Sequence, residues 1–281
     1  MNIVDILEEI EKVDGEVYER FSPRRTAMKE FFNIGKKVSL AAVPMALGSM
    51  FTKAYGQSTL PSGVKAVLQF ALTLEHFEAA FYTQALKASG GADFPGTAQG
   101  TSDKTAIGII SGHETSHVNF LKGVIGSDAV TAKASYDWTA SGAFPNPFAV
   151  GNYGVFLAVA QALEDTGVRA YKGQAPALVG QGGVLTAALN IHSVEARHAA
   201  KIRYMRSQNG FAIKPWITGG NDSGVPNAAA VYAGEELTTQ ATISIIGING
   251  TAVNAAAASE SFDEPLTTQQ VLDIVKLFGV S

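Results

Sequence analysis

The chain contains no cysteine, and only 16% of its residues are charged. The absence of cysteine excludes disulfide scaffolds, thiolate zinc sites and cysteine nucleophiles, so histidine and carboxylate are the strong metal ligands that remain. The net charge is only -4, and after about residue 50 no segment is basic enough to follow a phosphate backbone. We therefore expect no nucleic-acid partner. Scarce charge combined with abundant Ala and Gly indicates closely packed helices, not a solvated chain.

What is present is enough apolar material for a sizeable core. The 281 residues include 46% hydrophobic residues, which fits one domain of moderate size, alone or with appendages. Apolar residues recur at helical spacing in four long segments, which we predict as helices: 62–88, about 101–126, 153–172 and 182–208. For the second helix, the side chains of Thr101, Ser102 and Asp103 suit an N-cap.

The connections between these segments differ in length. Residues 127–147 are polar and contain prolines, and a loop of that length usually means a crossover or a functional lid. A crossover lets the second and third helices of a bundle run in the same direction. After Asn209-Gly210 the composition changes, so we predict an irregular appendage over 211–281 that packs on the bundle. Thr267 is expected to cap a short terminal helix within it.

The N-terminus has the pattern of an export signal. Ser22 to Lys29, with Arg24-Arg25, resembles the twin-arginine signal of bacteria, and an apolar run too short to span a bilayer follows. We predict that 22–56 is a removable signal and that the protein is periplasmic or otherwise exported. If the signal is not removed, 30–55 would form a helical hairpin or a membrane-surface segment, the one membrane contact expected. Residues 1–21 form an amphipathic extension, with a misassigned start codon or a docking helix as the alternatives.

Six residues form a pattern with metal-ligand chemistry. Glu114-x-x-His117 and Glu195-x-x-His198 each place two ligands on one helix face, one turn apart. The other two predicted helices each offer a central glutamate, Glu75 and Glu164. A glutamate from each of two helices, with Glu-x-x-His from each of the other two, is the pattern of di-iron and di-manganese sites in ferritin-like four-helix bundles. We therefore predict an all-α, ferritin-like four-helix bundle over 60–210.

Charge balance supports a filled site. Four ionised carboxylates in an apolar core would each cost several kcal/mol if unpaired, and two divalent cations cancel their charge. We predict that Glu114 and Glu195 bridge two metal ions, that Glu75 and Glu164 are terminal ligands, and that His117 and His198 bind one ion each. Carboxylate oxygens with one imidazole per ion suit Fe or Mn better than Cu(I) or structural Zn.

Polar residues next to these six have supporting roles, and three of them have two interpretations. Glu78, one turn after Glu75, is either an additional ligand or an outer or exposed residue, and His192 is either an outer neighbour or a gate. His76 and His113 point off the ligand face and are expected to be structural. Tyr82 and Tyr171 are expected to form hydrogen bonds from their hydroxyls to ligand carboxylates. Asp165 and Arg169, four residues apart, are expected to form a surface ion pair. Asp165 has a second interpretation, as a residue that holds a ligand histidine.

Several stretches resemble one known family. Residues 74–82, 162–171 and 194–200, with 232–235 and 262–266 in the tail, are similar to bacterial ferritin-like domain proteins related to the plant desiccation-related protein. The resemblance covers roughly 60–281. It implies a rubrerythrin-like bundle, export from the cytoplasm and an association with stress tolerance, but no established reaction.

Two functions follow as hypotheses. The first is a di-iron or di-manganese oxidoreductase of the peroxidase, catalase or ferroxidase type, acting on hydrogen peroxide or dioxygen or oxidising Fe(II). The second is a metal-stabilised structural or interaction protein without turnover, in which the site holds the bundle together. Iron storage is a weaker third hypothesis, and a homo-oligomer is compatible with all of them.

Overall fold

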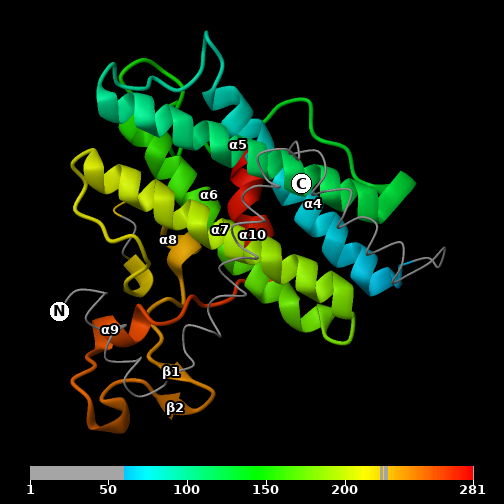
Figure 1. Ribbon diagram of the computed structural model, residues 1–281, viewed down its shortest axis with the longest axis vertical. Coiled ribbons are helices and arrows are strands. Elements are labelled where there is room, and N and C mark those ends of the chain that lie inside the picture. Colours follow the sequence, from blue (N-terminus) through cyan, green and yellow to red (C-terminus); the bar gives the residue numbers. More distant parts are fainter. Residues whose placement is uncertain (1–59, 222–223, 225–226, 281) are drawn as a thin grey trace, which may run out of the picture. The chain divides into compact units, whose positions relative to one another are not determined.

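Four long helices form the body of the chain in the computed structural model, which describes residues 60–221, 224 and 227–280. They are α4 (Ser62–Ala85), α5 (Ala98–Ile125), α6 (Tyr153–Gln174) and α7 (Gly182–Gln208) (Figure 1). The described residues are otherwise short helices, one two-stranded sheet and loops, so the all-α prediction is confirmed. The predicted extension (1–21) and export signal (22–56) lie outside the described residues. No helix among those described is both long enough and apolar enough to cross a membrane.

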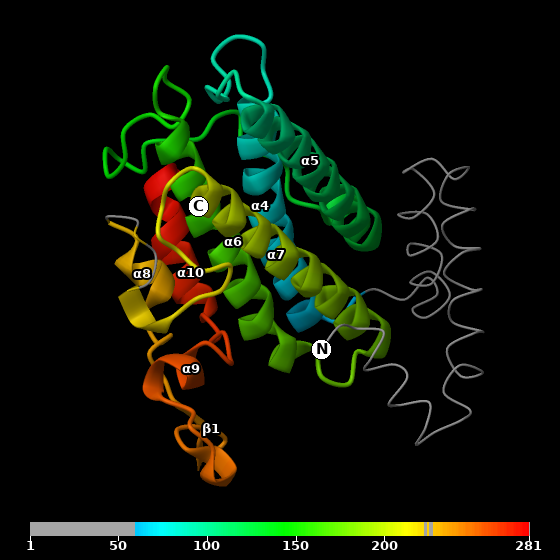
Figure 2. The ribbon, with the colours of Figure 1, turned by 60° about the vertical axis from the view of Figure 1, so that its left-hand side comes forward.

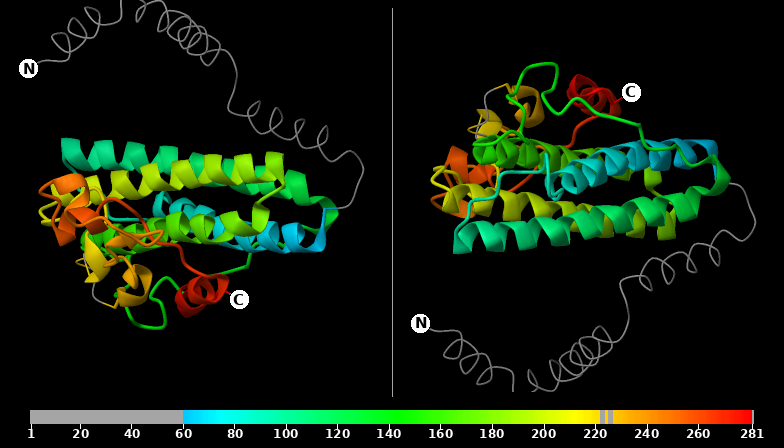
Figure 3. Two further views of the ribbon diagram at one scale, coloured as in Figure 1. Left: turned by 90° about the horizontal axis from the view of Figure 1, so that it is seen from below. Right: turned by 90° about the horizontal axis from the view of Figure 1, so that it is seen from above.

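The helices form two antiparallel pairs, α4 with α5 and α6 with α7 (Figure 3). Between the pairs, α5 and α6 run in the same direction. Near their first turns the Tyr153 hydroxyl donates to Asp103 over 2.8 Å, and near their last turns Leu121 and Tyr171 line one pocket. The connection between them, η1 (Gly126–Asp128) and residues 129–152, is therefore the predicted crossover.

Aromatic packing fixes the crossover against α4. Trp138 stacks on Phe77 with ring centroids 5.8 Å apart, and it meets Phe81 edge-on at 5.6 Å. Phe81 in turn stacks on Phe156 of α6 at 5.4 Å. Phe77, Phe81 and Phe156 are almost completely buried, so the crossover closes one side of the core.

Three predicted helix boundaries are wrong. The first helix ends at Ala85, not at residue 88. The second helix begins at Ala98, not near Thr101, because Thr97 is the N-cap and its hydroxyl accepts from the Gly100 amide over 3.1 Å. Asp103 is instead buried inside α5. The third helix does not break at Gly173 but continues to Gln174, followed by η2 (Ala175–Leu178). Gly173 is required for another reason, since a Cβ there would lie 1.9 Å from the Leu266 carbonyl oxygen of the tail.

The tail consists of short elements. It begins with η3 (Gly219–Asn221) and α8 (Ala229–Tyr232), followed by a hairpin of β1 (Thr239–Gln240) and β2 (Ile243–Ser244). After the hairpin come η4 (Ile248–Gly250), α9 (Ala255–Ser259), α10 (Thr268–Val275) and η5 (Lys276–Phe278). β1 and β2 pair antiparallel, with Thr239 opposite Ser244. Thr267 caps α10 as predicted, and Gln270 completes a capping box. α8 and α10 lie against α6, whereas α9 and the β1–β2 hairpin project away from the long helices (Figure 1 and Figure 2).

Buried ionic contacts hold the tail on α6. The Arg169 guanidinium is 1% exposed and donates to the carbonyls of Glu264 and Ala233, both over 2.7 Å, and to that of Val231. It also pairs with Glu235 at 2.7 Å. The predicted surface pair between Asp165 and Arg169 is therefore wrong, because Arg169 serves the tail and both residues are buried.

Asp165 has its own partners. Its Oδ2 accepts from Arg203 of α7 and from the Tyr232 hydroxyl of α8, each over 2.7 Å. It does not bond to a ligand histidine among the contacts described. α6 is thus tied to α7 through Asp165 and Arg203, and to the tail through Arg169 and Glu235, by buried pairs of opposite charge.

Candidate metal centre

All six residues of the predicted ligand pattern point into the middle of the four-helix bundle. Glu75, Glu114, Glu164 and Glu195, one from each long helix, are 0% exposed. His117 is 9% and His198 4% exposed. Each histidine lies three residues after a glutamate on the same helix, so helical periodicity alone brings the two side chains to one face.

The ligand atoms form two overlapping sets. Atoms within 4.8 Å of one another come from Glu75, Glu114, His117 and Glu195 in one set, and from Glu114, Glu164, Glu195 and His198 in the other. Both sets contain Glu114 and Glu195. This is the arrangement that two bridging carboxylates require. Metal coordination itself, including the bridging roles, stays a prediction.

Both imidazoles present Nδ1 to the carboxylates. His117 Nδ1 lies 3.2 Å from oxygens of Glu75 and of Glu114, and 3.1 Å from Glu195 Oε1. His198 Nδ1 lies 2.8 Å from Glu114 Oε1 and 3.2 Å from Glu195 Oε2. A histidine nitrogen and carboxylate oxygens therefore converge on each side of the shared pair.

Burial strongly affects protonation in this cluster. Desolvation, joined by the charge of Glu195, raises the pKa of Glu114 well above its usual range, and burial raises the pKa of Glu164 to about 6. Burial opposes ionisation of Glu195 as well, but the adjacent His117 and His198 imidazoles lower its pKa to about 2. Burial also opposes protonation of both histidines, yet the surrounding carboxylates raise their pKa overall. Without a metal, protons supply the positive charge that the carboxylates need.

The donor set fits bound metal. Glu114 Oε1, Glu164 Oε2 and Glu195 Oε1 are buried and accept no hydrogen bond within the described part of the chain. His198 Nδ1 approaches Glu114 Oε1 at 2.8 Å and His117 Nδ1 approaches Glu195 Oε1 at 3.1 Å, but neither approach has hydrogen-bond alignment. A buried, unsatisfied carboxylate oxygen is costly, and a cation in the cluster would satisfy all three. Hard oxygens with one imidazole on each side suit Fe or Mn.

Two tyrosines cross the bundle to hold ligand carboxylates. The Tyr82 hydroxyl of α4 donates to Glu164 of α6, and the Tyr171 hydroxyl of α6 donates to Glu75 of α4. This confirms the predicted hydroxyl bonds. Burial and the adjacent glutamates raise the pKa of both tyrosines well above the usual range, so both hydroxyls remain donors.

Glu78 adds a fifth carboxylate to the cluster. It is 4% exposed, and burial together with the charges of the four ligand glutamates raises its pKa well above the usual range. Gly167 of α6 makes room for it, because a Cβ at Gly167 would lie 3.1 Å from Glu78 Oε1 and 3.7 Å from Glu195 Cγ. Of the alternatives for Glu78, an exposed position is therefore wrong.

Of the other histidines, one contacts a histidine of the cluster and two contact backbone carbonyls outside it. His113 Nδ1 lies 3.0 Å from His198 Nε2 and the rings stack, so His113 orients a ligand histidine from outside the cluster. His76 contacts the Val130 carbonyl of the crossover, and His192 contacts the Val168 carbonyl. The sequence offered one hint for His113, its place directly before Glu114, but that place alone does not identify a contact with another helix.

Comparison with known proteins identifies the fold family. Residues 63–208, just over half of the chain, match the family model described as a ferritin-like domain. Searches of the curated proteins and of the solved structures found no match. The match extends over all four long helices and every residue of the cluster. The chain therefore belongs to the ferritin-like domain family.

Proposed function

We propose that this chain is an exported di-metal carboxylate oxidoreductase that binds two Fe or Mn ions and serves in stress protection. Its substrate is hydrogen peroxide or dioxygen, or Fe(II) that it oxidises. The observation that supports this proposal most is the pair of overlapping ligand sets that share Glu114 and Glu195. Two neighbouring redox-active ions supply two electrons to one small oxidant.

The side chains have distinct tasks in this proposal. Glu114 and Glu195 hold both ions, while Glu75 with His117 and Glu164 with His198 complete the two sides. Tyr82 and Tyr171 keep the outer carboxylates in position by donating hydrogen bonds across the bundle. The buried position of all four glutamates excludes bulk water from the reacting centre.

The fifth carboxylate favours a redox role over a purely structural one. Two divalent ions neutralise four carboxylates, and a fifth leaves one negative charge in excess. If Glu78 ionised, one divalent and one trivalent ion would balance all five carboxylates. Glu78 is buried beside the cluster, where an uncompensated charge is unfavourable. A site whose only purpose was to hold two divalent ions would be better balanced without it.

The alternative is a metal-stabilised structural or interaction protein. Its support is the complete burial of the ligand glutamates, since a sealed and fully ligated site is typical of structural metal. The two functions differ in one measurable respect. The oxidoreductase changes the oxidation state of its metal when an oxidant is added, and the structural protein does not.

The deciding experiment uses the full chain purified anaerobically. Metal analysis should find Fe or Mn at about two ions per chain. Peroxide or dioxygen should be consumed with a simultaneous change in the optical spectrum of the metal. Glu195→Ala removes a ligand from both sets and should abolish both signals, whereas Asp273→Asn on the exposed face of α10 should leave them unchanged. Metal bound without any oxidant consumption would support the structural alternative, and equal consumption in Glu195→Ala would refute the proposed site.

Export is the second part of the proposal, supported by the Arg24-Arg25 pattern and the apolar run that follows. Residues 1–60 fused to a reporter should direct it out of the cytoplasm of a bacterium with a twin-arginine translocase. The same fusion with Arg24→Lys and Arg25→Lys should remain inside. Equal export of both fusions would contradict the twin-arginine route.

A further inference from the structure

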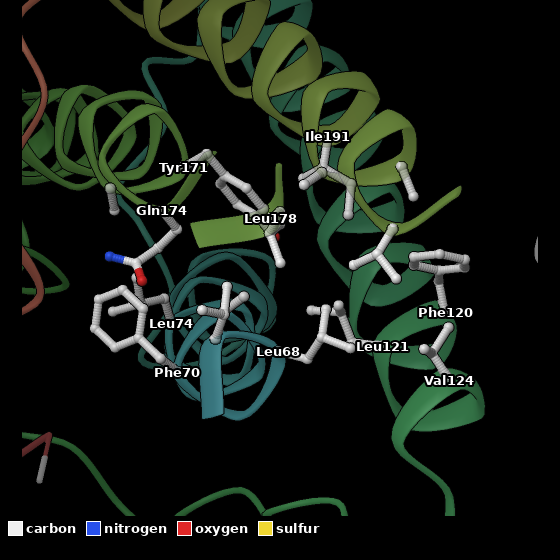
Figure 4. A pocket seen from close by; sticks show the side chains of 16 residues that line it. Leu68, Phe70, Leu74, Phe120, Leu121, Val124, Tyr171, Gln174, Leu178 and Ile191 are labelled. Carbon is white, nitrogen blue, oxygen red and sulfur yellow. The ribbon is translucent and has the colours of Figure 1, made fainter. Parts of the chain in front are cut away.

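An apolar pocket lies in the layer of the bundle next to the carboxylates. All four long helices and η2 contribute to its wall, and its free volume is about 20 Å³. Figure 4 shows Tyr171, Leu178 and Ile191 on one side of the pocket, facing Leu68 and Leu121 on the other. Leu68, Leu121 and Leu178 are almost completely buried. The space suffices for one molecule about the size of water or dioxygen.

The pocket is one helical turn from the ligands. Ala71 precedes Glu75 by four residues, Leu121 follows His117 by four, and Ile191 precedes Glu195 by four. Four residues of α-helix correspond to about 6 Å along its axis. All three helices place their pocket residue toward the same end of the bundle, so the pocket and the ligand cluster are consecutive layers.

Tyr171 belongs to both layers. It lines the pocket, and its hydroxyl donates to Glu75 of the cluster. The Tyr171 side chain thus separates the pocket from the carboxylates. A molecule in the pocket is adjacent to the metal centre but has no polar contact with it until it passes this ring.

The wall selects for apolar occupants. Of its sixteen residues only Tyr171 and Gln174 carry polar side-chain groups, and the Tyr171 hydroxyl is already engaged by Glu75. An apolar cavity of this kind does not hold ordered water, which needs several hydrogen-bonding partners, but it does accept small apolar molecules. Hydrogen peroxide would lose its hydrogen bonds to water on entry without replacement, at a substantial cost. Dioxygen has no such bonds to lose.

We propose that this pocket is a binding site for dioxygen that serves the metal centre. The inference rests on the proposed oxidoreductase function and deepens it, because it names dioxygen, not peroxide, as the oxidant that the fold admits through this layer. The occupancy of the pocket can be tested without any metal, and this keeps the two proposals separable.

The first test measures occupancy with xenon as the probe. Methyl-detected NMR of the full chain under xenon pressure should show saturable shifts at Leu68, Leu121 and Ile191. Ala187→Leu fills the pocket from α7 and should remove these shifts. Ala158→Leu, the same change beside a different hollow of the bundle, is the matched control and should retain them. Leu178→Ala enlarges the pocket and should strengthen xenon binding. This opposite effect tests the pocket independently of Ala187→Leu, whose loss of xenon shifts could also result from misfolding.

The second test measures delivery to the metal. Fe(II)-loaded protein is mixed in a stopped-flow instrument with dioxygen or, in a separate arm, with hydrogen peroxide. Ala187→Leu should slow oxidation by dioxygen about tenfold relative to oxidation by peroxide. Ala158→Leu should slow neither reaction, and Leu178→Ala should not slow the dioxygen reaction.

Each result decides the proposal. Absence of xenon shifts at the pocket methyls in the unaltered chain overturns it, and so does equal slowing of both oxidants by Ala187→Leu, which would indicate a disturbed metal site. Xenon binding in a protein that oxidises its metal with peroxide alone overturns the assignment of dioxygen. If neither oxidant reacts, the oxidoreductase function fails, and xenon binding then supports only an apolar gas site.

Discussion

The α4–α5 half and the α6–α7 half of the bundle carry the same ligand pattern but differ at the positions between the ligands. In both halves a glutamate precedes a tyrosine by seven residues, Glu75 with Tyr82 and Glu164 with Tyr171. Three residues after these glutamates, α4 has Glu78 where α6 has Gly167. The two positions face each other, since a Cβ at Gly167 would lie 3.1 Å from Glu78 Oε1. The candidate metal ligands are thus arranged symmetrically in the two halves, whereas the fifth carboxylate, Glu78, is present in one half only.

The outer sides of the two halves differ as well. α4 faces the crossover, whose Trp138 packs on Phe77 and Phe81, and the ion pair between Lys65 of α4 and Asp128 of the crossover is exposed to solvent. α6 faces the tail, which is attached through the buried charges of Asp165 and Arg169. The buried closure of one half is therefore apolar packing, which tolerates changes in pH, and that of the other is paired charges, which do not.

The largest effect is expected at the ionic side. Arg169→Ala leaves Glu235 buried without its cation and three tail carbonyls without their donor. Loss of one partner from a buried pair costs about 3–5 kcal/mol of unfolding free energy. Chemical denaturation should show this loss, and limited proteolysis should cut the tail within 228–266 first. Arg197→Ala, a more exposed arginine of α7, is the control. Equal destabilisation by both changes would show that the buried contacts of Arg169 have no special role.

The next effect tests the charge asymmetry. Glu78→Gln keeps the shape of the side chain and removes its negative charge, so the trivalent state of the metal loses support. A unit charge a few ångströms away contributes on the order of 2–4 kcal/mol in a partly screened interior. The reduction potential of the loaded site should therefore rise, as a spectroelectrochemical titration would record. Glu236→Gln removes the charge of an exposed glutamate, so it is the control and should leave the reduction potential unchanged. A potential that does not move in Glu78→Gln would mean that the fifth carboxylate is protonated in both redox states.

The tyrosine pair tests the symmetry itself. Tyr82→Phe and Tyr171→Phe each remove one hydrogen bond to a carboxylate, a contact worth about 1.5–3 kcal/mol. Because the two bonds are equivalent across the bundle, both variants should lose similar stability in thermal unfolding of the metal-loaded protein. A loss confined to one variant would break the symmetry of the ligand layer. The double variant should lose roughly the sum, since the two hydroxyls serve different carboxylates.

Much of this comparison was accessible from the sequence, because helical periodicity fixes which residues share a face. The four helices and the common face of the six candidate ligands follow from spacing along each helix, whereas the tyrosine bonds, which cross between α4 and α6, were expected because a buried hydroxyl beside carboxylates donates to one of them. The burial of Glu78 depends instead on a glycine in another helix. The partners of Asp165 and Arg169 lie in a tail with no regular pattern, so spacing pointed to the wrong pair. Alignment of the two halves would have placed Glu78 opposite Gly167, and that signal was present in the sequence.

The smallest effect is a pH dependence confined to the tail side. Burial raises the pKa of Glu235 to about 7, against an ordinary value of 4.5 in the unfolded chain, although Arg169 opposes the shift. Between these values the folded state binds more protons than the unfolded state, so this group's contribution to stability is present below 4.5 and is lost as pH rises through 7. The loss is on the order of 1 kcal/mol per pH unit between 5 and 7. Hydrogen exchange in 228–266 should quicken over this range, relative to Glu235→Gln, which cannot ionise. Exchange in the crossover, residues 130–148, should show no such difference between the two proteins, because the partners of Glu235, Arg169 and the Glu264 amide, lie on α6 and in the tail. If crossover and tail respond alike, the division into an apolar side and an ionic side is wrong.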